Sequence, residues 1–394
     1  MKIAMVVHGR FHAFDLARAV IERGHVVALL TNYPAWAVER FGVPRRHVRS
    51  FWPHGVLARA AWRLREKYGA LYPEAALHRL FGRWAAAQLS KERWDVMHLW
   101  SGVAEESLRA AATGCTLRLL MRGSAHIRAQ ARLLEEEERR TGAPQDRPSA
   151  WMIAREEREY ALADTIAVLS TFARRTFLAE GVPSHRLGLL PLGARLSAFR
   201  PPREVVEARC RRILDGATLR VLYVGAISFQ KGLWDLAAVV RELSASNFDF
   251  RLVGPRPAEA AAAVASLAGL ATVVPRQPQA KLPDVYLWGD VFVFPTIQDG
   301  YATVLAQAAA SALPILATTN CSGPDLIRDG ENGWVVPIRS PEALIERLRW
   351  CDTHRQELAD MVRRIYEKFQ PRDWANVAAD FEALCRAKLE AEGS

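Results

Sequence analysis

The chain of 394 residues has few cysteines and no long apolar run. Its five cysteines form no Cys-x-x-Cys pair, which excludes a disulfide framework and a zinc finger and predicts a reducing, cytoplasmic compartment. The longest weakly polar stretch, 260–274, contains Ser266, Gly269 and Thr272 and falls short of the roughly 18 apolar residues of a membrane-spanning helix. Charge interrupts the opening sequence MKIAMVVHGR too early for a signal peptide, so we expect a strand there.

The composition is typical of a folded, soluble protein, and the order of its segments favours an α/β fold. Half of the residues are apolar, 24% are charged and 9% are aromatic. Short β-branched runs alternate with helical patterns along the chain, which favours parallel sheets. The expected strands are Lys2–Val7, Val26–Thr31, Asp95–Leu99, Leu117–Met121, Thr165–Leu169, Leu187–Leu190, Leu219–Gly225, Asp249–Val253, Ala271–Val274, Asp290–Phe294, Pro314–Ala317 and Trp334–Val336.

The length is sufficient for two domains, and the sequence indicates where they divide. Four Pro and Gly residues between 191 and 202 interrupt regular structure before a new strand at 219–225. We therefore expect two doubly wound, Rossmann-like domains, 1–198 and 199–372, and a C-terminal helix within 373–394. Because such sheets bind ligands at the carboxyl ends of their strands, a central cleft between the domains is the expected site.

The net charge of +10 is concentrated in one stretch. Residues 45–93 carry eleven Lys and Arg against three Glu, with Trp52, Trp62 and Trp84 among them, and predict two helices separated near Tyr72. Basic helices with Trp bind anionic membrane surfaces, so peripheral attachment to the inner face of a membrane is one interpretation. The alternative is a solvated basic face whose Trp residues belong to the core. Without a recognition motif, nucleic acid is not an expected partner.

A run of carboxylates, RLLEEEERR, lies in the first half. It places Glu135 and Glu136 four residues before Arg139 and Arg140, a spacing that stabilises an exposed helix face. We expect the run at the surface and assign it no chemistry.

Two segments of the second half are suited to an anionic ligand. In VGAISFQKG a strand ends at Gly225, and Lys231 with Gly232 opens a helix, so a lysine charge adds to free backbone N–H groups and the helix dipole. The alternative is an ordinary turn with a surface lysine.

The second of these segments is FPTIQDGYATVLAQA, where a strand leads into a turn and a helix begins at about Thr303. Gly300 lets a ligand approach the backbone, and the N–H groups of 301–304 have no acceptor within the helix. Asp299 and Gln307 would present a carboxylate and an amide to sugar hydroxyls. The alternatives are a helix-capping aspartate and a surface glutamine.

Taken in order, these segments resemble the retaining glycosyltransferases of family 4, which have the GT-B fold. The resemblance covers nearly the whole chain. It rests on RGHVVALLTN, VLSTFARRTF, LLPLGARLSAF, VGAISFQKG, LPDVYLWGDVFVFPT, DGYATVLAQA, LPILAT and DLIRDGENGWVVP. It implies a hexosyltransferase type of enzyme that moves a sugar from a nucleotide diphosphate sugar to a hydroxyl acceptor, a glycan or a lipid-linked sugar, in cell-surface polysaccharide or glycoconjugate synthesis.

The resemblance also assigns roles to residues. The implied donor-binding residues are Gly225, Lys231, Asp299, Gly300, Tyr301, Ala302, Thr303, Val304 and Gln307. The implied catalytic residues are His126, Asp299 and Lys231, and Gly9, Arg10, His12 and Arg122 are expected on the acceptor or diphosphate side. Asp299 would position the sugar without acting as a nucleophile. The C-terminal helix would cross back to the first domain.

In that family a histidine of the first domain lies beside the reacting sugar, and two positions compete for this role. His126 follows a polar loop after a strand and is the better match. His98 is flanked by Met97, Leu99 and Trp100, which indicates a buried strand histidine. The chain has no Asp-x-Asp triplet to hold a divalent cation on the diphosphate, so we expect no metal and no cofactor.

The chain departs from the family pattern at four positions. Ala226 stands where Arg is frequent, which removes one phosphate cation, and Arg10 is a candidate replacement. Asp299 and Gln307 replace two glutamates, and Ala302 replaces a usual glycine. These departures keep a non-catalytic nucleotide-sugar-binding protein open as an alternative. A nucleotide-sugar epimerase, which shares the fold and needs no acceptor, is the other.

Overall fold

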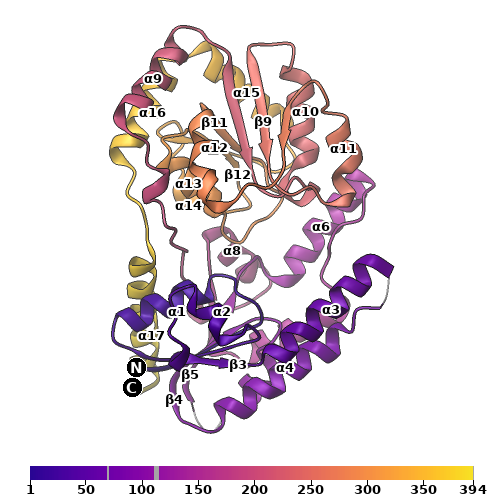
Figure 1. The fold of residues 1–394 in the computed structure, drawn as a ribbon, viewed down its shortest axis with the longest axis vertical. Coiled ribbons are helices and arrows are strands. Elements are labelled where there is room, and N and C mark those ends of the chain that lie inside the picture. The colour runs from indigo at the N-terminus through magenta and orange to yellow at the C-terminus, as the bar shows by residue number, and fades with distance from the viewer. Residues whose placement is uncertain (69–70, 111–114, 394) are drawn as a thin grey trace.

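The computed structural model describes residues 1–68, 71–110 and 115–393, which form two α/β domains, one above the other in Figure 1. The first domain has a seven-stranded sheet in the order β3-β2-β1-β4-β5-β6-β7, and the second has a six-stranded sheet in the order β10-β9-β8-β11-β12-β13. In each sheet the strand order reverses beside the first strand of the domain. Such switch points leave a crevice at the carboxyl ends of the strands.

The expected strands are all present, with ends shifted by at most two residues. The strands of the first domain are β1 (Lys2–Val7), β2 (Val26–Thr31), β3 (Val48–Ser50), β4 (Trp94–Trp100), β5 (Cys115–Arg122), β6 (Thr165–Val168) and β7 (Leu187–Leu189). Those of the second are β8 (Leu219–Val224), β9 (Phe248–Val253), β10 (Thr272–Val274), β11 (Val291–Phe294), β12 (Ile315–Thr318) and β13 (Gly333–Val336). The short edge strand β3 was not expected, because three residues show no periodicity.

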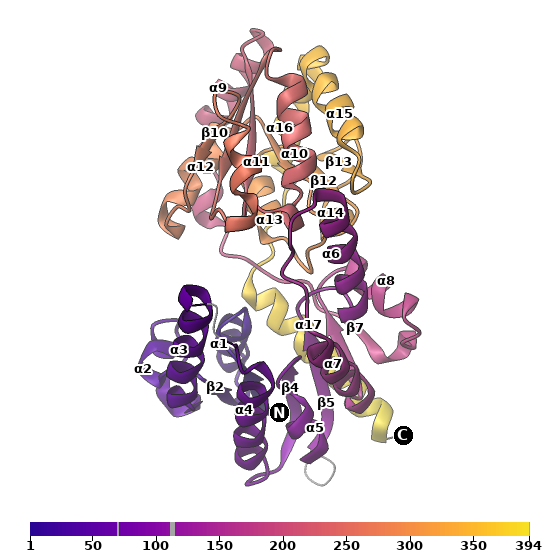
Figure 2. The ribbon, with the colours of Figure 1, turned by 90° about the vertical axis from the view of Figure 1, so that its right-hand side faces the viewer.

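Helices cover both faces of each sheet (Figures 1 and 2). The first domain contains α1 (Ala13–Glu22), α2 (Ala35–Glu39), α3 (Trp52–Tyr68), α4 (Glu74–Leu89), α5 (Glu105–Ala110), α6 (Ile127–Thr141), α7 (Ala150–Leu162) and α8 (Thr171–Ala179). The second contains α9 (Arg203–Leu214), α10 (Leu233–Leu243), α11 (Ala261–Ala265), α12 (Leu282–Trp288), α13 (Thr303–Ala310), α14 (Gly323–Leu326), α15 (Pro341–Thr353) and α16 (Arg355–Lys368), and α17 (Trp374–Gly393) follows. Among the described residues we find no helix that combines the length and the apolar composition of a membrane span.

Burial of both sheet faces explains the nearly continuous apolar strands. In β1, Ile3 and Met5 pack into one hydrophobic cluster that also contains Phe14 of α1 and Phe381 of α17. Ala4, between them, packs on the opposite face with residues of α4. Alternating side chains of a strand therefore enter two separate cores.

The chain crosses between the domains twice, and the two crossings lie side by side. The first runs from β7 to α9 and the second from α16 to α17, shown in yellow at the left of Figure 1. They touch where the N–H of Ala194 donates to the carbonyl oxygen of Arg372, 2.9 Å away. Helix α17 then packs against α1, where Arg23 forms an ion pair of 2.6 Å with Glu382.

Helix α6 contains the carboxylate run and lies against the second domain in both views (Figures 1 and 2). The expectation that the run is at the surface is wrong for Glu137, which is fully buried. Arg339 of the second domain donates to Glu136 at 2.7 Å and to Glu137 at 3.0 Å, and Arg140 pairs with Asp235 of α10. The run therefore joins the two domains, which helix periodicity alone does not predict.

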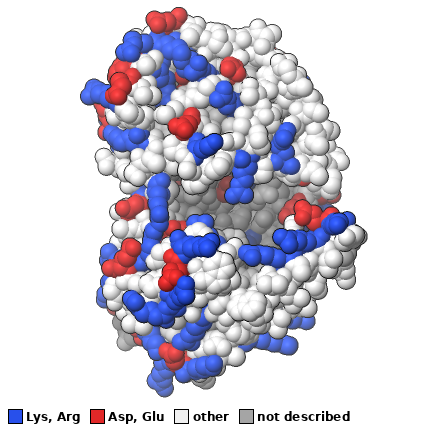
Figure 3. Space-filling model, viewed as in Figure 1, with Lys and Arg blue, Asp and Glu red and all other residues white. Residues whose placement is uncertain are grey.

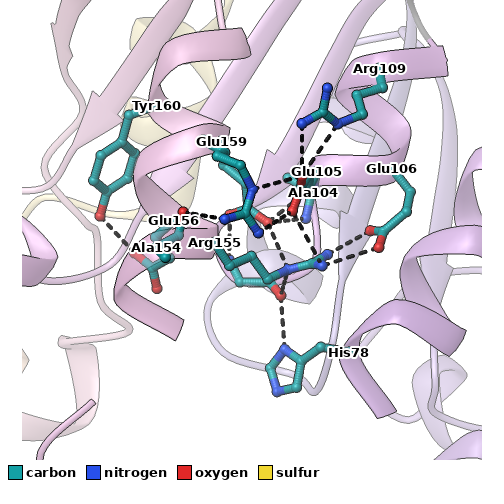
Figure 4. Close-up of polar contacts among 12 residues, drawn as sticks. His78, Ala104, Glu105, Glu106, Arg109, Ala154, Arg155, Glu156, Glu159 and Tyr160 are labelled. Atoms are coloured by element: carbon teal, nitrogen blue, oxygen red, sulfur yellow. Dashed lines mark hydrogen bonds and ion pairs between the residues drawn. The ribbon is translucent and has the colours of Figure 1, made fainter. Parts of the chain in front are cut away.

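A buried ionic cluster fixes the loop between β4 and α5. Figure 4 shows Arg155 of α7 between the carboxylates of Glu106 and Glu159. Glu159 accepts the N–H groups of Gly102, at 2.6 Å, and of Ala104, at 2.9 Å. Burial and a neighbouring carboxylate raise the pKa of Glu159 to about 8 against the opposing guanidinium.

Candidate functional site

The turn after β8 brings a lysine to the carboxyl edge of the second sheet. Lys231 ends a short 3₁₀ turn, Phe229–Lys231, that Ser228 caps, and Gly232 opens α10 with φ +84°. A Cβ at Gly232 would lie 1.9 Å from the carbonyl oxygen of Pro295, so this position requires glycine for its conformation and for space. The close approach places the lysine turn beside the loop that follows β11.

Lys231 and Asp299, two predicted site residues, meet directly. The Nζ of Lys231 donates to Oδ2 of Asp299 at 2.7 Å, and both side chains are about one-fifth exposed, at 20% and 22%. Oδ1 of Asp299 accepts the N–H of Tyr301 at 3.2 Å. The pair is therefore a partly exposed cation and carboxylate, with a helix N-terminus next to it.

Helix α13 begins at Thr303, as expected, but its first N–H groups are not all free. The N–H of Tyr301 donates to Asp299, and the N–H of Ala302 donates to Oγ of Ser322 at 3.1 Å. Within the described residues, the N–H groups of Thr303 and Val304 have no acceptor. Two donors, instead of the four expected, are available to an anion here.

Gln307 is buried beneath this helix start and not at the surface. Its Oε1 accepts the hydroxyl of Tyr286 at 2.9 Å, and the side chain is nearly buried. The Tyr286 ring packs on Phe199 and Phe292 in the core of the second domain. Gln307 therefore ties the helix to the core, and its amide nitrogen is the part left for a ligand.

The predicted polar loops of the two domains touch at this point. Oγ of Ser124 donates to Oε1 of Gln298 at 2.9 Å. A Cβ at Gly300 would lie 2.0 Å from the carbonyl oxygen of Gly123, so glycine at 300 lets the loops meet. The structure thus brings the loop after β5 beside the loop before α13, as the two-domain cleft requires.

A cavity of about 500 Å³ adjoins the turn after β8. Gly225, Ala226 and Gly254 line one side and the loop 276–279 lines the other. A Cβ at Gly254 would lie 1.7 Å from the carbonyl oxygen of Gly225, so the two strand ends are packed tightly. The size and the exposed backbone suit a flat, polar group such as a nucleobase.

The residues predicted in the loop after β1 point in different directions. Gly9 has φ +99°, and its N–H donates to Oδ1 of Asn32 at 2.8 Å. Arg10 forms an ion pair of 3.4 Å with Asp15 and lies over the ring of Phe41 at 4.1 Å.

The ring of His12 packs against Trp100, and burial lowers the pKa of His12 to about 4. The diphosphate role of these residues stays a prediction.

Arg122 and His126 are both engaged inside the first domain. Arg122 donates to Glu156 at 3.0 Å and to the side chain of Gln130 at 2.5 Å.

His126 caps α6 by accepting the N–H of Arg128 at 3.3 Å, and its ring lies 4.9 Å from those of Tyr160 and Phe177. The catalytic role of His126 and the ligand role of Arg122 remain predictions.

His98, the rival of His126, is a buried strand histidine, as its apolar neighbours indicated. Its ring lies between those of Trp100, at 4.5 Å, and Phe381, at 5.1 Å. Burial lowers the pKa of His98 to about 3, so the ring is neutral at physiological pH.

The sequence analysis did not identify a histidine cluster that lies where α3 and α4 meet the end of β1. The ring of His8, which follows β1, lies 5.2 Å from that of His54 and 5.4 Å from that of His78. His8 and Asn32 line a separate pocket of about 350 Å³. The signal was available, because His8 and Asn32 each directly follow a predicted parallel strand, where ligands bind.

The two helices expected in the basic stretch are α3 and α4, and their Trp residues are not all core. Trp52 and Trp62 are 54% and 50% exposed. Leu57, Leu64 and Tyr68 of α3 are also at least half exposed. Figure 3 shows Lys and Arg side chains along the rim of the hollow between the domains, on the side where α3 lies. The expectation that the Trp residues of this stretch belong to the core is therefore wrong for Trp52 and Trp62 of α3, and attachment of the basic stretch to a membrane stays a prediction.

Within the described residues, no group of three or more His, Cys, Asp or Glu side chains is arranged to hold a metal ion. The site consists of a lysine, a carboxylate, two backbone N–H groups without an acceptor among the described residues, and a cavity lined by backbone. These groups are suited to hydrogen bonding and to charge stabilisation of a phosphate ligand.

Comparisons of the sequence relate the chain to glycosyltransferases. Residues 218–352, in the second domain, match the model of the family Glycosyl transferases group 1. The chain is 24% identical over 204 residues to the putative colanic acid biosynthesis glycosyltransferase WcaL of Escherichia coli, with 48% of each chain covered. It is 29% identical over 229 residues to the D-inositol 3-phosphate glycosyltransferase of Thermomonospora curvata, with 52% of this chain and 53% of that protein covered. The chain spans about half the length of the curated relatives that it matches.

Solved structures share the whole architecture. HepE of Anabaena in complex with UDP has a TM-score of 0.67 at 13% identity, with 98% of this chain and 100% of that chain covered. HepE in complex with UDP-glucose has a TM-score of 0.65 at the same identity and coverage. Similarity at this identity shows the fold, and the expected GT-B fold is confirmed. The resemblance to glycosyltransferases is confirmed at the level of the group 1 family match, and membership of family 4 stays a prediction.

Proposed function

We propose that the protein is a glycosyltransferase that moves a sugar, of the hexose type, from a nucleotide diphosphate sugar to a hydroxyl acceptor with retained configuration. The match of the second domain to the group 1 family and the GT-B fold support the reaction class. HepE, of the same fold, binds UDP and UDP-glucose, which supports a nucleotide-sugar donor. The name of WcaL supports a role in cell-surface polysaccharide or glycoconjugate synthesis.

The observation that carries this proposal is the pairing of Lys231 with Asp299, since Lys231 ends the same turn after β8 whose first residues, Gly225 and Ala226, line the cavity of about 500 Å³. A nucleobase in the cavity would place its diphosphate at the turn after β8. Lys231 and the free N–H groups at the start of α13 would then neutralise the phosphate oxygens, while Asp299 would accept from sugar hydroxyls.

The chemistry needs stabilisation of the leaving diphosphate more than it needs a protein base. Charge develops on the phosphate oxygens as the sugar leaves, and fixed donors around them lower the barrier. In the proposed reaction the acceptor hydroxyl attacks on the face that the diphosphate leaves, and a phosphate oxygen takes its proton. This pathway requires neither a nucleophile nor a metal, so we propose a metal-independent reaction.

Thermal unfolding in the presence of a panel of nucleotide sugars tests the donor. Binding to the folded state stabilises it by about 2.7 kcal/mol at a ligand concentration of 100 times Kd. We expect one nucleoside diphosphate class to raise the melting temperature, and its sugar conjugate to release the nucleoside diphosphate when acceptor is present. If no nucleotide or nucleotide sugar shifts the melting temperature, the proposed donor site is wrong.

We also propose that α3 attaches the enzyme to an anionic membrane, where a lipid-linked acceptor would be available. Leu57, Leu64 and Tyr68 share the outer face of the helix at i, i+7 and i+11 spacing and are 51%, 50% and 68% exposed. Arg65 and Lys67 lie among them. Apolar side chains with flanking cations are suited to the boundary between head groups and acyl chains.

Sedimentation with vesicles of graded anionic lipid content tests this attachment. The wild type should pellet at low salt and lose binding as salt screens charge over about 8–10 Å. Leu57→Gln combined with Leu64→Gln should abolish pelleting, whereas Leu178→Gln, at an exposed leucine of α8, should not. Equal pelleting of the two variants would show that α3 is not the attachment site.

A non-catalytic nucleotide-sugar-binding protein is the second candidate, and two observations favour it. Lys231 already pairs with Asp299, and Ala226 supplies no second phosphate cation. Such a protein would bind the donor and never release its nucleoside diphosphate. An epimerase would convert the donor without acceptor, so incubation of donor alone distinguishes it.

A further inference from the structure

The pocket of about 350 Å³ beneath α3 takes no part in the proposed donor chemistry. It opens at the carboxyl ends of β1 and β2, where Gly9 and Asn32 line it. Gly55 brings α3 close to this edge, because a Cβ there would lie 2.3 Å from the carbonyl oxygen of Asn32. The pocket is thus a built feature of the first domain, beside the loop that follows β1.

Two arginines on one face of α3 line the pocket. Arg59 and Arg63 are four residues apart, so their side chains lie on the same side of the helix. Neither forms an ion pair within the described part of the chain, and the Arg59 guanidinium lies over the ring of Tyr33 at 5.3 Å. Two guanidinium groups without a carboxylate partner favour a ligand with negative charge.

Aromatic rings form the outer walls of the pocket. These are Trp62, which precedes Arg63 in α3, and Tyr72, which precedes α4. The centroids of the two rings are 6.2 Å apart, and the ring planes meet at 85°. A ring face packs on the apolar face of a sugar, and the polar edge of Trp or Tyr hydrogen bonds to its hydroxyls. The walls therefore suit a sugar ring, next to the two cations.

The floor of the pocket is polar but carries no charge. Burial and the nearby rings of His78 and His54 lower the pKa of His8 to about 3, so its imidazole is neutral. The Nε2 of His8 is buried and has no hydrogen-bond partner among the described residues. Behind it, Nδ1 of His78 lies 2.8 Å from the carbonyl oxygen of Gly102, which the Arg155 cluster of Figure 4 fixes. The positive charge therefore comes from α3.

We propose that this pocket is an oxyanion site, in which Arg59 and Arg63 select an acceptor whose sugar carries a phosphoryl group. This inference rests on the proposed function, since it names the class of acceptor for that reaction. The phosphoryl group lies between the two guanidinium groups, and the sugar lies against Trp62 and Tyr72. A soluble sugar phosphate and a lipid-linked glycosyl diphosphate share this chemistry.

Titration calorimetry with hexose 1-phosphates and their neutral parent hexoses tests the site without donor. The second arm uses a short-chain prenyl diphosphate hexose in detergent micelles. We expect phosphorylated ligands to bind and neutral hexoses to bind at least about tenfold more weakly, the factor that one charge-assisted hydrogen bond gives. Tighter binding of the prenyl compound identifies a lipid-linked acceptor, and equal binding identifies a soluble one.

Variants of α3 decide whether the pocket is responsible. Arg59→Gln and Arg63→Gln should each weaken the phosphorylated ligands by about tenfold or more and leave nucleotide binding unchanged. Lys67→Gln removes the same charge from α3 outside the pocket and should have no effect in the soluble arm. Arg59 and Arg63 are exposed, and neither forms an ion pair among the described residues. The melting temperatures of the two variants should therefore match that of the wild type.

Two results would overturn the inference: equal affinity for phosphorylated and neutral sugars, or equal loss in Lys67→Gln and Arg63→Gln. Failure of the proposed function is a separate outcome. In that case no nucleotide sugar binds or turns over, while the affinity of the pocket for hexose phosphates is still measured directly.

Discussion

Lys231 is the residue on which the proposed donor site depends most. The Nζ of Lys231 donates to Oδ2 of Asp299 at 2.7 Å. The sequence could not show this contact, because the two residues are 68 positions apart in the chain. A bound diphosphate would take over this cation, and Asp299 would be left to accept from the sugar. The binding of the diphosphate and the release of Asp299 from its ion pair would thus be coupled through the ammonium group of Lys231.

Replacement of Lys231 by Ala should weaken donor binding by about 1.5–3 kcal/mol, the range for a hydrogen bond to a charged group. The measurement is the Kd of the nucleoside diphosphate by calorimetry. Lys91→Ala, at an exposed lysine of the first domain, is the matched control. Unchanged affinity in Lys231→Ala would remove this residue from the site.

Glu105 provides a test of the buried ionic cluster by pH. Hydrogen bonds from Arg158 and Arg109 lower the pKa of Glu105 from 4.5 to about 2. A pKa lower in the folded state adds stability above about pH 4.5, and this stability is lost as the pH falls towards 2. Glu105→Gln should therefore cost about 1 kcal/mol at pH 7, after allowance for solvent screening, and less at pH 3.

Urea unfolding at pH 7, 5, 4 and 3 measures this difference, with Glu357→Gln, at an exposed glutamate of α16, as control. A gap between wild type and Glu105→Gln that stays constant or grows as the pH falls would contradict the assignment.

Helix α6 connects the two domains through contacts that the sequence pattern did not predict. Arg339 adopts φ +59°, a left-handed conformation that is unfavourable for a side chain, and it contacts Glu136, Glu137 and the carbonyl oxygen of Leu133. Because Glu137 is buried, loss of its partner would leave a desolvated carboxylate. The contacts of α6 hold an arginine in a strained backbone conformation.

Arg339→Ala should therefore lower the melting temperature by several degrees, since it removes a buried ion pair and keeps the left-handed conformation. Arg339→Gly loses the same contacts but relieves the backbone, so it should be about 1 kcal/mol more stable than Arg339→Ala. Arg347→Ala, at an arginine of α15 that pairs with its neighbour Glu346, is the control. If Arg339→Gly is no more stable than Arg339→Ala, the left-handed backbone at position 339 is not strained.

The sequence predicted elements well because parallel strands buried on both faces are continuous apolar runs, as in β1 and β2. It predicted the start of α13 at Thr303 from the turn chemistry of Asp299 and Gly300. It could not predict contacts that depend on how two domains meet. The burial of Glu137 by Arg339 is such a contact. The pairing of Arg122 with Glu156 and Gln130 arises within the first domain, from the packing of α6 and α7 against the end of β5, and amphipathic spacing does not encode it either.

The two domains face each other across the hollow that Figure 3 shows, and the two crossings of the chain lie together at one side of the molecule (Figure 1). The lysine turn and α13 come from the second domain, and the pocket beneath α3 comes from the first. The donor and the acceptor would therefore approach from opposite domains, and the outer face of α3 would bring the first domain to a membrane.

The proposed reaction transfers a sugar from a nucleotide sugar to an acceptor with retained configuration. The most direct test follows the anomeric proton by NMR while the protein acts on its stabilising nucleotide sugar with hexose phosphate and prenyl-linked acceptors. We expect a product with the anomeric configuration of the donor, formed together with one nucleoside diphosphate and absent in Lys231→Ala. An inverted product, an epimer formed without acceptor, or a bound donor that is never consumed would contradict it.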